Sequence, residues 1–185
     1  MKRILPLVLA AGLATVLLAQ DDLSQAKSLI QNGNCSEAIA PLQKVYKSQF
    51  RKLAGEKAAV MLTECYLRQH NRDEAENVSS RFLEYYVKSD YRERVELAHA
   101  IVSVEKGNVY EGVESMLRIL AYSKNPAARS RTKDVVIQTL AASLLNADQL
   151  QSLLEKFPVD KDVIGWMQLQ IGRECQNVKR YRAAR

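Results

Sequence analysis

A short segment of the chain recurs three times at a constant spacing, and this recurrence restricts the possible folds more than any other feature. The copies read Ser36-Glu37-Ala38-Ile39, Asp73-Glu74-Ala75-Glu76 and Tyr110-Glu111-Gly112-Val113. Their third residues are all small, and the differences 75 − 38 and 112 − 75 both equal 37 residues. A period of this length is typical of stacked helix pairs. A small residue is expected where the second helix of a pair crosses the first at close range.

The chain from Asp22 onward has a helical pattern throughout. Apolar residues recur at spacings of three and four in blocks of roughly 10 to 18 residues, without sustained strand-type alternation. Turn signals separate the blocks, at residues 32–34, 70–73, 106–108, 125–126 and 157–160. Asn125 before Pro126 is a good helix start, because the Asn side chain accepts a free backbone N–H and Pro suits the first turn. We therefore predict an all-α fold.

The residues around the first three turns resemble the tetratricopeptide repeat (TPR) family. Gly33-Asn34-Cys35-Ser36-Glu37-Ala38 is similar to the Gly-Asn turn and Glu-Ala helix start of that family, and Gly107-Asn108 follows the same pattern. His70-Asn71 replaces Gly-Asn in the second copy. The resemblance covers roughly residues 22–185. It implies a right-handed α-solenoid of about five TPR-like helix pairs.

The last two pairs are expected to depart from the pattern. The fourth pair is predicted at Asp134 to Leu145 and Asp148 to Phe157, without a Gly turn. The fifth is predicted as a first helix through Ile171 to Cys175, a turn at Lys179-Arg180-Tyr181, and one helical turn ending at Arg185. A helix this short is marginal because nucleation is costly. We therefore expect the last pair to be incomplete, with further sequence or another chain covering the apolar side of residues 164–175.

One group of repeat proteins is closer than the others. An apolar leader, several repeats and the segment Ala147 to Pro158 are similar to the N-terminal helical region of penicillin-binding-protein activators and of relatives of amino-acid transport receptors. This resemblance implies a non-enzymatic periplasmic scaffold for protein–protein interactions in envelope or cell-wall assembly. The alternative is the helical region of a periplasmic ligand-binding receptor whose ligand domain lies beyond residue 185. The activators are usually lipoproteins, whereas no Cys follows the leader here.

Residues 1–19 have the layout of a secretory signal peptide. Lys2 and Arg3 precede an apolar run from Ile4 to Ala19, and Gln20 is followed by two Asp residues. The run is shorter than the roughly 20 residues of a membrane-spanning helix. We predict cleavage after Ala19, a repeat domain over residues 20–185, and an exported, periplasmic protein without stable membrane insertion. A retained membrane anchor is the alternative.

Charge and residue content argue against nucleic-acid binding and against catalysis. The formal net charge is +6, but the basic residues are dispersed along the chain and are densest between Arg173 and Arg185. A solvated helix face or contact with an anionic surface accounts for that group. No Cys, Ser or acidic residue stands at a spacing from His70 or His99 that suggests metal binding or catalysis. We expect no enzyme activity, no cofactor, no metal site and no nucleic-acid partner.

The three cysteines are Cys35, Cys65 and Cys175. Each is expected to be a small buried hydrophobic residue. Export would permit a disulfide, but the sequence does not choose among the three possible pairs.

Two apolar sets are candidate surfaces for a protein partner. In a stack of helix pairs, the first helices line a concave surface that receives a peptide or a helix. The first helix of the third pair is more apolar than one buried stripe requires, and its candidate residues are Leu97, Ile101 and Val104. Burial against a neighbouring domain or protomer would also explain this. Tyr85 and Tyr86 belong to an aromatic cluster that serves either as a partner-binding anchor or in packing between repeats.

Overall fold

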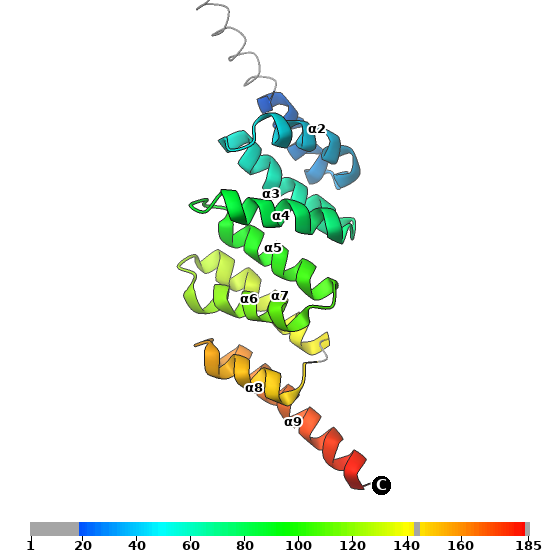
Figure 1. Cartoon of the computed structure of the whole chain (residues 1–185), viewed down its shortest axis with the longest axis vertical. Helices are drawn as coiled ribbons and strands as arrows, with labels where there is room; N and C mark the ends of the chain where they lie inside the picture. Colours follow the sequence, from blue (N-terminus) through cyan, green and yellow to red (C-terminus); the bar gives the residue numbers. More distant parts are fainter. Residues whose placement is uncertain (1–18, 143–144, 184–185) are drawn as a thin grey trace, which may run out of the picture. The chain divides into compact units, whose positions relative to one another are not determined.

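The computed structural model describes residues 19–142 and 145–183, with side chains up to residue 177, and all regular secondary structure in these ranges is α-helical (Figure 1). The predicted all-α class is therefore confirmed for this part of the chain. No helix among these residues is long and apolar enough to span a membrane. Residues 1–18 of the predicted signal peptide lie outside the described residues, and Ala19 and Gln20 begin the first described helix.

The chain divides into two compact units, Met1–Val95 and Glu96–Arg185, with the boundary inside one helix. Unit 1 contains a helix over residues 19–31, then α2 (Cys35–Ser48), α3 (Leu53–Arg68), α4 (Arg72–Tyr85) and the beginning of α5 (Arg92–Glu105). α2 packs against α3, and α3 packs against α4. Leu42, Leu62 and Phe82 are among the largest fully buried side chains of its core.

Unit 2 contains the rest of α5, then α6 (Val109–Tyr122), α7 (Pro126–Ala142), α8 (Ala147–Lys156) and α9 (Lys161–Ala183). α6 packs against α7, while α9 packs against both α7 and α8. Side chains from all five helices form one hydrophobic core, which includes Leu97, Met116, Leu140, Leu153 and Met167. Every described helix of this unit therefore contributes to the same core.

The same turn leads into α2, α4 and α6. Each of these helices has 14 residues, and they begin at residues 35, 72 and 109, which are 37 apart. The residue two before each helix has a left-handed backbone, with φ of 84° at Gly33, 55° at His70 and 94° at Gly107. The next residue, always Asn, donates its amide to the carbonyl five residues earlier, at 2.8 to 2.9 Å. This hydrogen bond defines a Schellman turn, so the predicted recurrence is confirmed in the local structure.

The small residue of each copy is the fourth residue of its helix. Ala38 and Ala75 have no exposed surface. A Cβ atom at Gly112 would lie 2.5 Å from Cγ2 of Val104 and 2.7 Å from the carbonyl oxygen of Ala100, both on α5. The helices therefore cross at close range at Gly112, as the sequence predicts.

The two helices of the fourth predicted pair are present, the first of them longer than predicted, and both pack against α6 and α9. α7 begins at Pro126, not near Asp134, because Asn125 caps it: its Oδ1 accepts the amides of Ala127 and Ala128 at 3.0 and 3.3 Å. α8 follows the predicted second helix, and Asn146 and Gln149 form a capping box at its start. The helix start predicted at Asn125 is therefore confirmed.

The predicted turn at Lys179-Arg180-Tyr181 is wrong, because α9 is a single helix of 23 residues from Lys161 to Ala183. Between Arg173 and Ala183 the chain has no Gly or Pro and is rich in Arg, Lys, Gln and Glu, which favour helix. The apolar side of this helix is partly covered within unit 2, since Met167 is buried in the core and Ile171 packs against it. Leu169 remains 46% exposed. Residues 184–185 lie outside the described residues.

Candidate binding groove

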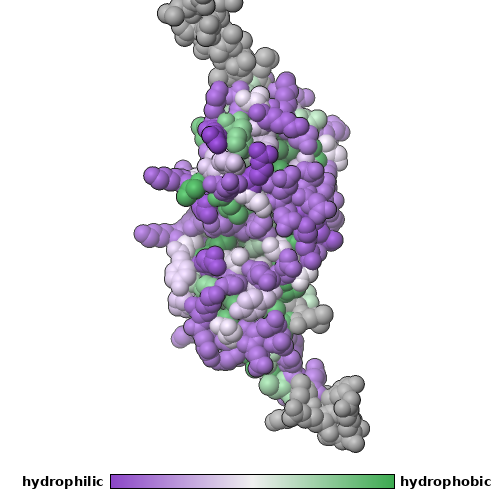
Figure 2. Space-filling view, viewed as in Figure 1, coloured by the Kyte–Doolittle hydropathy of each residue, from purple (hydrophilic) through white to green (hydrophobic). Residues whose placement is uncertain are grey.

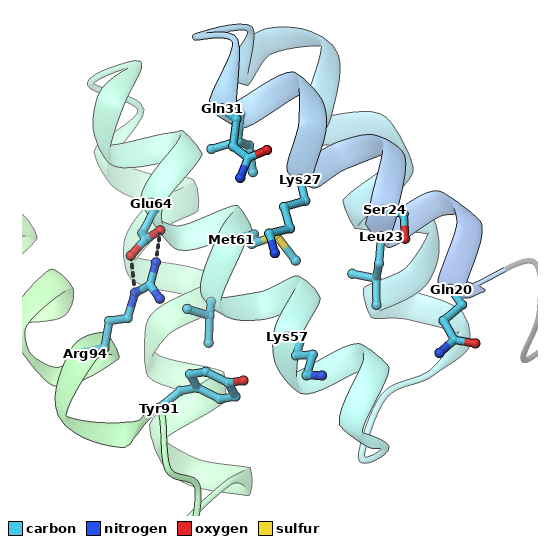
Figure 3. Close-up of a pocket in the computed structure, with 12 residues that line it drawn as sticks. Gln20, Leu23, Ser24, Lys27, Gln31, Lys57, Met61, Glu64, Tyr91 and Arg94 are labelled. Carbon is cyan, nitrogen blue, oxygen red and sulfur yellow. Dashed lines mark hydrogen bonds and ion pairs between the residues drawn. The ribbon is translucent and has the colours of Figure 1, made fainter.

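Unit 1 contains a groove of about 510 Å³ between the helix over residues 19–31, α3 and the start of α5 (Figure 3). Leu23, Lys27 and Ile30 line it from the first of these helices, at the i, i+4 and i+7 positions of one face. Ala26, beside this face, has no exposed surface and belongs to the core. Each helix thus has one face in the core and another toward the groove.

The middle of the groove is formed by α3. Lys57, Met61 and Glu64 occupy the i, i+4 and i+7 positions of one face of α3, and Val60 lies beside them. Leu62, which has no exposed surface, lies on the other face. The groove therefore combines apolar side chains with charged groups.

An ion pair joins α3 to the start of α5 at one side of the groove. Nε and Nη2 of Arg94 donate to Oε1 and Oε2 of Glu64 at 2.5 and 2.6 Å, as the dashed lines in Figure 3 show. The hydrogen bonds to Glu64 raise the pKa of the Arg94 guanidinium. The side chains are 43% and 25% exposed, so this bidentate pair orients the two helices more than it stabilises the fold.

The groove has an excess of positive charge. Lys27, Lys57 and Arg94 line it together with a single acidic residue, Glu64, which is paired with Arg94. Among the described residues, neither Lys27 nor Lys57 has an ion-pair partner. In Figure 3 the Lys27 side chain extends from the first helix toward α3. Two free ammonium groups beside apolar side chains suit a ligand that has apolar side chains and carboxylates.

The structure places Leu97, Ile101 and Val104 in unit 2. Leu97 is 5% exposed and belongs to the core, while Ile101 and Val104 are partly buried and pack against it. These additional apolar residues of α5 therefore pack in or against the core of unit 2. The three residues do not line the groove of unit 1.

Tyr85 and Tyr86 lie at the end of α4 in unit 1, away from the groove lining. Tyr86 is 9% exposed, and its hydroxyl accepts the amide of Arg51 at 3.0 Å. Burial raises the pKa of Tyr86. Tyr85 is 42% exposed, and its ring centroid lies 5.1 Å from that of Phe50. Tyr86 thus packs inside the unit, whereas Tyr85 keeps an accessible face.

A shallow depression of about 740 Å³ lies beside Tyr85, and it includes the exposed side chains of Leu53 and Val87. The two side chains are 61% and 63% exposed. On the face drawn in Figure 2, hydrophobic patches are small and separated by hydrophilic residues. The depression is more open and less enclosed by helices than the groove, so the groove is the better candidate site.

The sequence analysis missed the groove residues, although the repeat contains a signal for them. Lys57 and Arg94 are 37 residues apart, and so are Lys27 and Glu64. The positions that line the groove are therefore equivalent positions of successive copies. Leu97, Ile101 and Val104 are the equivalents, two copies later, of Leu23, Lys27 and Ile30. The predicted surface therefore uses the same repeat positions as the groove. The prediction placed it in the third copy of the repeat, whereas the groove lies mainly at the first and second copies.

The remaining candidate residues are separate from the groove. Cys35 and Cys65 are buried, as predicted, but Cys175 is exposed on α9, and its predicted burial is wrong. Within residues 19–142 and 145–177, no three His, Cys, Asp or Glu side chains are grouped so as to hold a metal ion. Comparisons with known protein families, curated proteins and solved structures found no match to this chain.

Proposed function

We propose that this chain is a non-enzymatic helical-repeat scaffold of the cell envelope that binds a segment of a protein partner in the groove of unit 1. The observation that carries the proposal is the groove itself, because equivalent positions of successive 37-residue copies line it. Repeat proteins bind extended peptides or helices on surfaces of this kind.

The proposal includes a right-handed α-solenoid of TPR-like pairs. Its regular pairs are the helix over residues 19–31 with α2, α3 with α4, and α5 with α6. Three features support this arrangement: the identical length of the second helices, their spacing of 37 residues, and the recurring Schellman turn. The groove then corresponds to the surface lined by first helices.

The partner segment combines apolar side chains with carboxylates. Leu23 and Met61 offer apolar contacts, and Lys27 and Lys57 offer two positive charges without an ion-pair partner in the part of the chain that the structure describes. A carboxylate near Arg94 would have to compete with Glu64 for the guanidinium. The resemblance to envelope repeat proteins and the signal-like residues 1–19 support a periplasmic partner.

Site-specific photo-crosslinking in the native envelope tests the proposal. A photoreactive amino acid at Met61, in the groove, is expected to crosslink one protein reproducibly. The matched control is the same amino acid at Asn77, which is exposed on α4 and does not line the groove. The crosslink at Met61 should disappear when Lys57 is changed to Glu in a chain whose circular dichroism is unchanged. Equal crosslinking at Met61 and Asn77 would contradict the proposal.

A further inference from the structure

The thiols of Cys35 and Cys65 meet inside unit 1. Cys35 is the first residue of α2, and Cys65 lies near the end of α3. They are 6% and 0% exposed, and a hydrogen bond with Cys35 is one cause of the raised pKa of Cys65. Cys175 is exposed in unit 2. The structure therefore makes a choice among the three possible cysteine pairs that the sequence leaves open.

Neighbouring contacts hold the two helix ends together at this point. Ser36 follows Cys35, and Gln69 lies one helical turn after Cys65. Nε2 of Gln69 donates to Oγ of Ser36 at 2.9 Å, and α2 packs against α3 along their lengths. The two thiols are therefore neighbours because of the helix packing.

We propose that Cys35 and Cys65 form an intramolecular disulfide when the folded chain meets a disulfide oxidant, such as a thiol–disulfide oxidoreductase or oxidised glutathione. One thiolate attacks a sulfur of the oxidant, giving a mixed disulfide and releasing one thiol. The second cysteine loses its proton and attacks the protein sulfur of the mixed disulfide, releasing the second thiol. Two protein thiols are oxidised, and one disulfide of the oxidant is reduced to two thiols.

Cys35 is the cysteine that reacts first. It begins α2, directly after the turn that contains Gly33, so opening this turn exposes its sulfur without unfolding α3. Cys65 is buried in α3, and burial, together with its hydrogen bond with Cys35, raises the pKa of the Cys65 thiol to about 12. A thiol with so little thiolate at neutral pH is a poor first nucleophile. Cys65 is therefore the resolving cysteine.

The disulfide would join α2 to α3, and α3 is one of the helices that line the groove. Neither cysteine lines the groove itself, but Cys65 directly follows Glu64, which does. The bond also closes the loop from residue 35 to residue 65. Loop-closure entropy for a loop of about 30 residues raises the folding equilibrium constant by roughly 10² to 10³. This inference does not depend on the proposed function.

The test uses the full folded chain with the Cys175→Ser substitution, which leaves only the proposed pair. The chain is incubated in an oxidising glutathione buffer, its free thiols are alkylated, and it is digested without reduction. Mass spectrometry is expected to show the peptides of Cys35 and Cys65 joined, with the loss of two hydrogen masses, and a reductant should reverse this. The same oxidation of the wild-type chain in denaturant should also give pairs that include Cys175.

Two results would overturn the proposal. One is that alkylation still modifies both Cys35 and Cys65 after the oxidation, which shows that both thiols stayed free. This result counts when the same buffer has converted Cys175 of the wild-type chain to a mixed disulfide. The other is that native oxidation joins either of them to Cys175. In a Cys65→Ser chain with unchanged circular dichroism, one glutathionyl group should remain on Cys35; if none is found, Cys35 is not the first to react. The linkage in the Cys175→Ser chain decides the proposal even if the Cys65 variant does not fold.

Discussion

The Gly112→Ala substitution tests the close helix crossing that underlies the repeat. The added Cβ would lie 2.7 Å from the Ala100 carbonyl oxygen, whereas ordinary contacts begin at 3.4 Å, so the atoms must separate by about 0.7 Å. That oxygen belongs to the backbone of α5 and cannot rotate away. Overpacking of this kind costs about 1 to 3 kcal/mol, and the higher helix propensity of Ala returns about 1 kcal/mol. We expect a net loss of up to about 2 kcal/mol of unfolding free energy.

The chain offers matched controls for this substitution. Gly165 and Gly172 lie in α9, and a Cβ at either position would meet no atom within 4 Å. Gly165→Ala and Gly172→Ala should therefore keep the gain in helix propensity and stabilise unit 2 by up to about 1 kcal/mol.

Urea unfolding followed by the fluorescence of Trp166 measures these differences. Trp166 is the single tryptophan of the sequence and lies on α9, so its signal reports on unit 2. Gly112→Ala should lower the urea midpoint, and the two α9 substitutions should leave it unchanged or raise it. If Gly112→Ala raises the midpoint as much as Gly165→Ala does, the helices do not cross closely at residue 112.

Three further substitutions test other parts of the structure. His70→Gly should stabilise unit 1 by about 1 kcal/mol, because His70 has the left-handed backbone (φ of 55°) that Gly adopts without cost; a lower thermal midpoint by circular dichroism would contradict this. Ala38→Leu should destabilise unit 1 by about 1 to 3 kcal/mol in urea, whereas Ala40→Leu, at an exposed position of the same helix, should have little effect; equal losses would show that residue 38 is not at a tight crossing. Lys57→Glu should weaken binding of the partner segment about tenfold or more, while Lys47→Glu, exposed on α2 and outside the groove, should not, and a titration of each variant by calorimetry distinguishes the two.

The fold was largely predictable because its strongest signals are local. The small residues at 38, 75 and 112 gave the period, and the Asn at each turn gave the helix starts. The end of the chain was not predictable in the same way. The segment around Gly172 resembled the approach to another turn, but Gly172 lies in open space on an exposed helix face. Since nothing there interrupts the backbone hydrogen bonds, helix propensity decides and α9 continues.

The sequence indicates which face of a first helix can line a groove, but not which copy of the repeat keeps that face accessible. The face that contains Leu97, Ile101 and Val104 is equivalent to the face that contains Leu23 and Lys27. Packing decides which copy keeps this face accessible, because the third copy uses these positions in the core of unit 2. That choice depends on residues far along the chain, such as Leu153 and Met167 of α8 and α9.

The repeated helix pairs also affect how the chain folds during its synthesis. The Schellman turns and the contact between Gly112 and α5 join helices that are adjacent in sequence. Contacts between nearby residues require little loop-closure entropy, and proteins rich in them fold quickly. The pair of α5 and α6 is complete at Tyr122, before any residue of α7, α8 or α9 has been synthesised. The local contacts of each pair can therefore form while the next pair is still being made, whereas the core of unit 2 is complete only when α9 is present.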